Sequence, residues 1–212
     1  CPSSARPSRL PFEALAAPAG LDVDRDGNVY VADRGRSRIV RIGVDGAFSV
    51  VAGMPGGPGL TGERIAATRA RVNAPRDVAV APDGSLYIAD TGNRRIRHIG
   101  LDGKIQTVVG EVEARDVGPF AVTKLDGPTS MAWIPALSSY LVAGGLGGRI
   151  YRADMNARVL SHAACEPGGF DDARLPAVRA KLAREFGYAA GLAYDERTQT
   201  VYASDRERHV IR

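Results

Sequence analysis

The stretch YIADTGNRRI, residues 87–96, has the pattern of two short strands joined by a turn. Tyr87–Ala89 is an apolar run of residue types that favour strands, and Asp90–Asn93 combines residue types that favour turns. The run Arg95–Ile99 follows, alternating with the period of two that a strand requires. The stretch therefore predicts two antiparallel strands with a tight connection.

The residues on either side extend this pair to a unit of four strands. Asp77–Val80 precedes it, separated from Leu86 by a turn at Asp83-Gly84, where glycine supplies the positive φ that a tight hairpin needs. A further Asp-Gly turn at residues 102–103 leads into the run Lys104–Val109. We expect a four-stranded antiparallel meander.

The meander is repeated along the chain. Residues 18–53 align without a gap on residues 75–110, and about 16 of the 36 positions are identical. A weaker third copy begins at Pro128, and a fourth runs from about Leu192 to the last residue, Arg212. Tandem copies of a four-stranded unit are typical of the blades of a β-propeller, because a lone meander buries too little surface.

We therefore expect an all-β fold in which residues 1–212 form one propeller fragment. The predicted blades cover about residues 18–53, 75–110, 128–162 and 188–212. Propellers close with about 4–8 blades. Three full blades and a partial fourth predict an incomplete ring, in which the outward apolar faces of the end blades are exposed. Residues 1–17 carry three prolines and no β-branched run, so we do not expect them to supply the missing strand.

The apolar positions of the strands should lie mostly buried between the blades. The predicted core positions of the first two copies are Val78, Val80, Tyr87, Ile88, Ile96 and Ile99 with their counterparts Leu21, Val23, Tyr30, Val31, Ile39 and Ile42.

The motif YIADTGNRRI closely resembles the core of an NHL repeat, and YVADRGRSRI at residues 30–39 resembles it less strictly. The long connections between copies look like the long-loop NHL form of bacterial extracytoplasmic proteins and of teneurin-like propellers. The resemblance implies a propeller fold. The resemblance says little about function, since the family includes scaffolds, RNA binders, receptor ectodomains and a few lyases.

Long inserts at residues 54–72, 111–125 and 166–182 connect the copies, and two of them, near residues 66–70 and 176–180, predict one or two helical turns. Strands alternate in direction, so each insert should emerge at the same end as the turn between the second and third strands. Those turns fall at residues 34–37, 91–94, 145–148 and 206–209, while the opposite end carries tight Asp-Gly turns. Elaborated loops on a rigid scaffold are where function usually lies, so this end is the candidate binding face.

Basic residues gather on this predicted face. They are Arg34, Arg36, Arg94, Arg206 and Arg208 on the turns, with Arg64 and Arg69 in the first insert. They are candidates for binding an acidic partner or RNA, and the alternative is that they are solvated turn residues. Base stacking needs exposed aromatic side chains, and these turns contain none, which disfavours nucleic acid.

No catalytic residue, metal site or cofactor is predicted. Asp33, Asp90 and Asp205 recur at the end of the second strand, where each is expected to accept backbone N–H groups in its own turn and to pair with an arginine such as Arg38 or Arg95. The three histidines, His98, His162 and His209, occupy unrelated places in their repeats and so predict no metal ring. Cys165 has no partner pattern of a nucleophile.

Composition gives weaker limits. The chain has 212 residues, a net charge of +4 and two cysteines, and it contains no apolar run of membrane-spanning length. It begins with Cys1, which fits either a lipidated mature protein or excision from a longer chain. We expect an extracytoplasmic, non-catalytic propeller that binds a protein or an extracellular ligand. The alternatives are a propeller-type lyase or lactonase and an RNA-binding NHL module.

Overall fold

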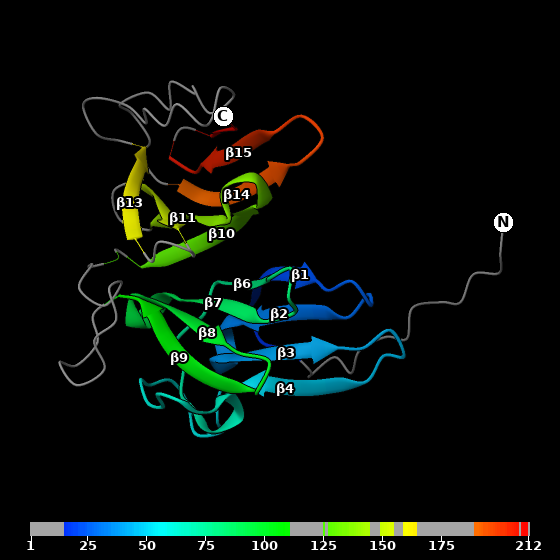
Figure 1. The fold of residues 1–212 in the computed structure, drawn as a ribbon. Helices are drawn as coiled ribbons and strands as arrows, with labels where there is room; N and C mark the ends of the chain where they lie inside the picture. Colours follow the sequence, from blue (N-terminus) through cyan, green and yellow to red (C-terminus); the bar gives the residue numbers. More distant parts are fainter. Residues whose placement is uncertain are drawn as a thin grey trace, which may run out of the picture.

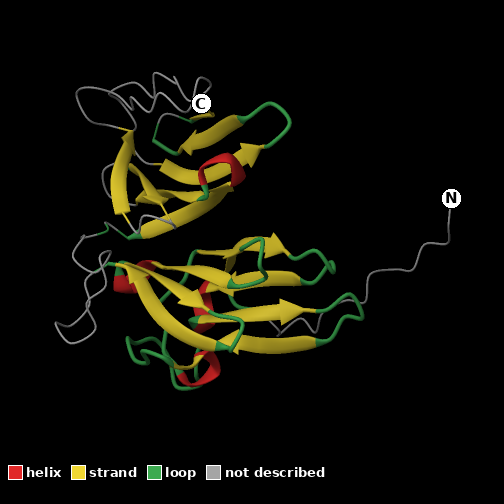
Figure 2. Cartoon of the chain, in the orientation of Figure 1, coloured by secondary structure: helices red, strands yellow, loops and turns green. Residues whose placement is uncertain are grey.

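The structure, a computed structural model, describes residues 15–110, 125, 127–144, 149–154, 159–164, 189–207 and 209–211. Strands dominate these residues, and the helical segments are single 3-10 turns (Figure 2). The strands form separate antiparallel sheets in which sequence neighbours are hydrogen-bonded (Figure 1). The predicted all-β class is confirmed.

The first two sheets are full blades. Blade 1 consists of β1 (Pro18–Val23), β2 (Val29–Asp33), β3 (Arg38–Ile42) and β4 (Phe48–Ala52), with the 3-10 turn η1 (Arg34–Arg36) between β2 and β3. Blade 2 consists of β6 (Asp77–Val80), β7 (Leu86–Asp90), β8 (Arg95–Ile99) and β9 (Lys104–Val109), with η3 (Thr91–Asn93) in the matching place. The insert between blades 1 and 2, at residues 54–72, adds β5 (Ile65–Ala66) and η2 (Ala67–Arg69), and β5 pairs with the outer edge of β9.

Two further sheets follow. Blade 3 consists of β10 (Pro128–Ile134), β11 (Ser139–Gly144), β12 (Ile150–Asp154) and β13 (Val159–Ala164), with η4 (Pro135–Leu137) between its first two strands. Blade 4 consists of β14 (Ala189–Asp195), β15 (Thr200–Asp205) and β16 (Val210–Ile211) in the described residues.

The hairpin turns of the first two blades follow the predicted chemistry. Gly27 and Gly84 have φ of 84° and 89°, a region open to glycine without steric cost. The turn at the same end of blade 3 is different, because it contains η4, which begins at Pro135, and Ser138, which follows η4 with φ 46°. The expectation that this end carries only Asp-Gly turns is therefore wrong.

The apolar core lies between successive blades, in three clusters. Ile39 of blade 1 packs with Val78 and Ile88 of blade 2. Ile96 of blade 2 packs with Tyr140 of blade 3, and Leu141 of blade 3 with Ala203 of blade 4. Each blade is thus stabilised by its neighbours, as expected for stacked repeats.

Carboxylates join the innermost strands of neighbouring blades. Asp22 of β1 accepts a hydrogen bond from the backbone N–H of Val80 in β6, at 2.8 Å. Asp77 of β6 accepts one from the N–H of Met131 in β10, at 2.7 Å. Burial raises the pKa of Asp77 to about 7, although hydrogen bonds from Met131 and Val78 oppose the rise.

The sheets do not close into a ring. Innermost strands contact one another in the order β1, β6, β10, β14, and no sheet in the described residues joins blade 1 to blade 4. In Figure 1 blades 1 and 2 fill the lower half, and blades 3 and 4 fill the upper half.

The core prediction holds in blade 2 and fails at two positions of blade 1. Val78 is 1% exposed, whereas its counterpart Leu21 is 60% exposed and Val23 is 49% exposed. The reason is tertiary: the face of blade 2 that carries Val78 packs on blade 1, and no sheet of the described residues packs on the matching face of blade 1. The other predicted core residues of both blades are buried or half-buried.

A groove between blade 1 and the first insert

The insert between blades 1 and 2 follows the outer rim of blade 2 and then turns inward. Strand β5 lies along β9, and Ala67, at the start of η2, donates its N–H to the carbonyl of Gly103. The chain then returns to η3, where Gly92 donates its N–H to the carbonyl of Asn73. The end of the insert thus lies at the β7–β8 turn, as strand parity predicts, while its middle covers the sheet edge. The helical turn predicted near residues 66–70 is η2.

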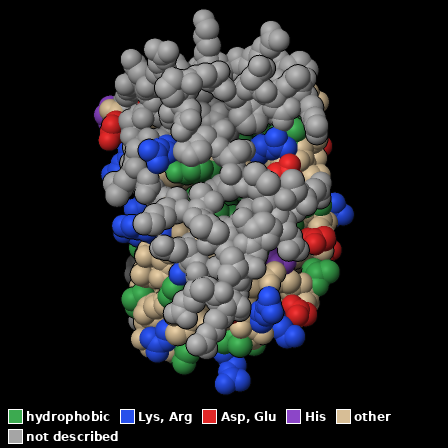
Figure 3. All heavy atoms as spheres, turned by 60° about the vertical axis from the view of Figure 1, so that its left-hand side comes forward, with side chains coloured by type: hydrophobic (Ala, Val, Ile, Leu, Met, Phe, Trp, Pro, Cys, Tyr) green, Lys and Arg blue, Asp and Glu red, His purple; other side chains and the backbone are tan. Residues whose placement is uncertain are grey.

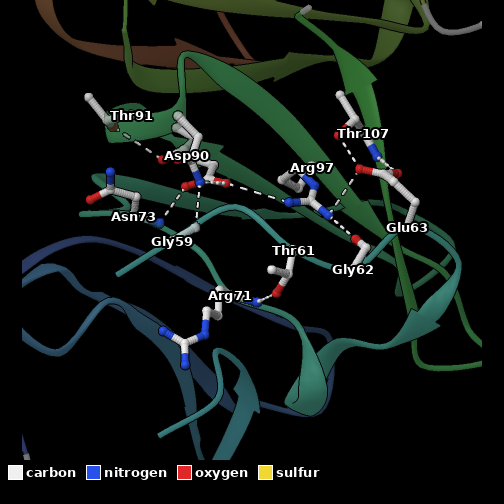
Figure 4. A network of polar contacts seen from close by, with 12 residues as sticks. Gly59, Thr61, Gly62, Glu63, Arg71, Asn73, Asp90, Thr91, Arg97 and Thr107 are labelled. Carbon is white, nitrogen blue, oxygen red and sulfur yellow. Dashed lines mark hydrogen bonds and ion pairs between the residues drawn. The ribbon is translucent and has the colours of Figure 1, made fainter. Parts of the chain in front are cut away.

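A buried arginine fixes the insert to the sheet (Figure 4). Arg97 of β8 is fully buried and donates from Nη2 to the carbonyl of Gly62. The same Nη2 lies 3.2 Å from Glu63 Oε1, and Nη1 lies 3.7 Å from Asp90 Oδ2. Glu63 also accepts hydrogen bonds from the backbone N–H of Thr107 at 2.7 Å and from its hydroxyl at 2.6 Å. One cation therefore faces two carboxylates beneath the insert.

Burial changes the acidity of these groups. It raises the pKa of Asp90 to about 6, although hydrogen bonds from Asn73 and Asn93 and the nearby guanidiniums oppose the rise. Burial lowers the pKa of Arg97, and the two carboxylates oppose that shift. Partnered charges of this kind orient a loop, and removing one partner leaves the other charge uncompensated. The network is a structural clamp.

A groove opens where the start of this insert passes the corner of blade 1. Its volume is about 560 Å³. This insert groove is lined by residues that include Arg36, Arg38, Val50, Met54, Gly57 and Thr68. None of the described residues that line it is acidic. A groove of this size, with apolar walls and a few cationic groups, has the character of a ligand or peptide site.

The two arginines of the groove differ. Arg38 is held by an ion pair with buried Asp33, Nε to Oδ2 at 2.8 Å, and its guanidinium lies 5.4 Å from the centre of the Phe48 ring. Arg36 is exposed, and its side chain makes no hydrogen bond or ion pair within the described ranges. Arg36 is therefore the cation available to a bound group.

The other predicted binding arginines are dispersed. Arg34 lies in η1 beside the groove, Arg69 ends η2, Arg94 follows η3, and Arg206 follows β15; all four are exposed. Arg64 lines a separate hollow of about 260 Å³ with His98, Asp102 and Lys104, at the β8–β9 turn. Arg208 lies outside the described residues.

The recurrent aspartates at the end of the second strand have structural roles. Asp33 pairs with Arg38 as predicted. The expectation that these carboxylates cap their own turn is confirmed for Asp205, which accepts the N–H of Glu207 at 3.2 Å. It is wrong for the other two, because Asp33 and Asp90 accept N–H groups from Ala16 and Asn73, each 17 positions earlier in the chain. The guanidinium nearest Asp90 is that of Arg97, two residues beyond Arg95.

The histidines and cysteines add no reactive cluster to the described residues. The ring of His98 stacks at 4.6 Å on that of Tyr87, and burial lowers its pKa. His209 is exposed. Within the described part of the chain no three His, Cys, Asp or Glu side chains could together hold a metal ion. Cys1 and Cys165 lie outside that part.

Sequence reasoning did not identify Arg97 and Glu63 as partners. One signal was present in the repeat: Arg97 occupies the position of Val40 in the first copy, where an apolar residue suits the strand. A charged side chain at an apolar repeat position indicates a partner that the other copy lacks.

Two segments of the chain match known families. Residues 15–42 match the family described as NHL repeat, and residues 51–134 match the Teneurin NHL domain. These two segments therefore carry NHL-type repeats. The chain is 36% identical over 97 residues to human Teneurin-4 and 36% identical over 98 residues to zebrafish (Danio rerio) Teneurin-3. Each match covers 40% of this chain and 4% of the teneurin.

Solved structures share the fold at low identity. A streptogramin B lyase aligns with a TM-score of 0.61 at 10% identity, covering 95% of this chain and 52% of the lyase chain. A gluconolactonase from Xanthomonas campestris aligns with a TM-score of 0.59 at 20% identity, covering 91% and 58%. A structure of a nidogen–laminin complex aligns with a TM-score of 0.60 at 14% identity, covering 89% and 58%. The chain thus spans little more than half of each of these solved chains.

Proposed function

We propose that this chain is a non-catalytic propeller scaffold that binds a protein partner at the insert groove. The observation that carries the proposal is the groove itself: about 560 Å³, with Val50 and Met54 on its walls and Arg36 at its rim. An apolar surface beside an unpaired cation is suited to a segment that buries an apolar side chain and offers a carboxylate.

Exposed arginines around the groove would steer such a partner. Arg34 and Arg69 lie on the two 3-10 turns nearest the groove, and Arg94 and Arg206 lie on the equivalent turns of later blades. Charges at the rim of an interface mainly affect the rate of association and its dependence on salt. Arg208 is included in the proposed basic surface on the basis of its position in the sequence, whereas Arg64 lies in the separate hollow at the β8–β9 turn and is not part of that surface.

A protein partner is preferred to nucleic acid. Lys and Arg side chains are scattered over the face in Figure 3 and interspersed with Asp and Glu. Among the large apolar side chains exposed in the described residues, Tyr202 is the one aromatic. Single-stranded nucleic acid is held by several aromatic platforms along a basic path.

Fold alone does not decide between binding and catalysis, because the structures that share it include a lyase and a lactonase. The non-catalytic assignment rests on the groove, where no carboxylate, histidine or cysteine is among the described residues of the lining. Lactone hydrolysis by the purified protein in the presence of divalent metal ions, at a rate above the uncatalysed rate, would contradict it.

The proposed location is extracytoplasmic, which the similarity to teneurins supports. Among the described residues, no helix has the length and apolar character needed to cross a bilayer. Fractionation of the source cells with an antibody to this chain tests the location.

The function is tested by site-directed photo-crosslinking in the source cells. A photoreactive amino acid at Met54, in the groove, should yield a defined protein adduct that Arg36→Glu abolishes. The matched control is the same amino acid at Leu101, which is similarly apolar and exposed but lies at the β8–β9 turn. Equal adduct yield from both positions, or none from position 54, would refute the proposal.

A further inference from the structure

The insert is seated on blade 2 by three polar anchors. Asn93 donates from Nδ2 to the carbonyl of Gly59 at 2.9 Å, Arg97 donates to the carbonyl of Gly62, and Thr107 binds the carboxylate of Glu63. Beyond these contacts, β5 pairs with the outer edge of β9 at Ile65–Ala66. An extended segment thus adds to the sheet edge, with side chains and carbonyls fixed by the blade.

Blade 1 has the equivalent site at the outer edge of β4, but different residues occupy the three anchoring positions. The repeat places Arg36 where blade 2 has Asn93, and Val40 and Val50 where blade 2 has Arg97 and Thr107. Val50 is 36% exposed and lines the insert groove with Arg36. The outer edge of β4 pairs with no strand in the described residues, whereas the outer edge of β9 is covered by β5. The seat is open at the position where a strand would add.

The exchanged residues specify what fits. A segment that follows the path of the insert would place its counterpart of Gly59 at Arg36, where a carboxylate would pair with the guanidinium. Its counterpart of Glu63 would lie against Val50, where an apolar side chain is favoured because Val40 and Val50 replace the guanidinium and the hydroxyl that Glu63 contacts in blade 2. The main chain would bond to the edge of β4, as peptides do in strand addition.

We propose that the outer edge of β4 and the insert groove take an extended segment of a protein partner, with an acidic residue at Arg36 and an apolar residue, four positions later, against Val50. This inference rests on the proposed function and names the mode of recognition. Main-chain pairing supplies affinity, and the two side-chain positions supply selectivity.

The probe is a labelled peptide of sequence DLTGLRIA, which is residues 59–66 with Asp for Gly59 and Leu for Glu63. Its matched control is KLTGLRIA. Fluorescence anisotropy with the full chain should show at least about tenfold tighter binding of the first peptide. Arg36→Glu should reverse the preference, whereas Arg197→Glu, at the exposed β14–β15 turn, should leave it unchanged. A tenfold change corresponds to about 1.4 kcal/mol.

The possible results of these experiments distinguish which segment occupies the edge of β4. Failure of both peptides to bind, or binding that Arg36→Glu does not alter, overturns the proposal. Binding that appears only after removal of residues 1–14 means that the chain's own terminal segment takes the seat, and it overturns the assignment to a partner. If the chain associates with itself and Arg36→Glu abolishes that association, a second copy of the chain occupies the edge of β4. This result also overturns the assignment to a partner. If a crosslinked adduct forms at position 54 in cells but the peptide does not bind, strand addition is refuted and the proposed function still stands.

Discussion

The backbone N–H of Asn73 is hydrogen-bonded to the carboxylate of Asp90, 17 residues later, at 2.7 Å. Ala16 and Asp33 repeat this relationship in blade 1, at the same distance. The aspartate of the repeat motif therefore positions the chain entering its blade, and the turn beside it is held as a consequence. A carboxylate fits because its second oxygen is left to face a guanidinium or an amide.

Replacing Asp90 by alanine should destabilise the protein by about 3–5 kcal/mol, because it leaves the buried guanidinium of Arg97 with one carboxylate and the N–H of Asn73 without an acceptor. Urea unfolding measures the change. The control is Asp45→Ala in the exposed β3–β4 turn, where Ala47 is the hydrogen-bond partner. Equal losses for both variants would contradict the structural role of Asp90.

Asp77 should make stability fall as pH rises. Its folded pKa of about 7 lies above the ordinary value of 3.8, so the folded state holds a proton that the unfolded state has released. The contribution is complete below about pH 4 and is lost as pH rises through 7, with a slope of at most about 1.4 kcal/mol per pH unit. Urea unfolding from pH 4 to 8 should show a shallower fall for Asp77→Asn. An unchanged slope would show that Asp77 does not titrate in this range.

Glu63 should control local opening of the insert. Glu63→Gln removes the charge that faces Arg97 and weakens the acceptor for Thr107, so hydrogen exchange should quicken at amides bonded within the insert, such as those of Met54 and Ala70. A loss of about 1–3 kcal/mol corresponds to a rate increase of about 5- to 150-fold. Glu196→Gln in the exposed β14–β15 turn is the control and should leave these rates unchanged. Acceleration confined to other regions would argue against the clamp.

Equivalent apolar positions of the two blades should respond differently to truncation. Val78→Ala should cost about 1–3 kcal/mol, because the side chain is buried between blades, whereas Leu21→Ala should change stability by about 0.5 kcal/mol or less. Thermal or urea unfolding of both variants gives the comparison. A large loss for Leu21→Ala would mean that blade 1 is covered on that face in solution.

The exposed face of blade 1 should also promote association. Leu21→Lys with Val23→Lys should lower light scattering at high protein concentration, since both residues are exposed on one strand. The matched variant is Val44→Lys with Leu101→Lys, which adds the same charge at exposed turns outside that face. Equal effects of both variants would point to net charge as the cause.

The sequence by itself determined the repeat, the strands and their turns. Glycines at the Asp-Gly turns and alternating apolar residues are local signals. The positive φ of Gly84 is required by its own hairpin turn and does not depend on what the blade packs against. The register follows from them, with Ile88 opposite Arg97 and Asp90 opposite Arg95. Local pattern is sufficient here because hairpin pairing joins residues close in the chain.

Only the tertiary structure decided which equivalent residues share an environment. Leu21 and Val78 have the same place in the repeat, yet blade 1 covers Val78, whereas no sheet of the residues that the structure describes covers Leu21. In the same way, the insert groove forms where η1 of blade 1 meets the insert that leads to blade 2. The burial of Arg97 depends on the same insert, which arrives from the previous blade. Burial and charge pairing are set by distant segments, which a local pattern does not encode.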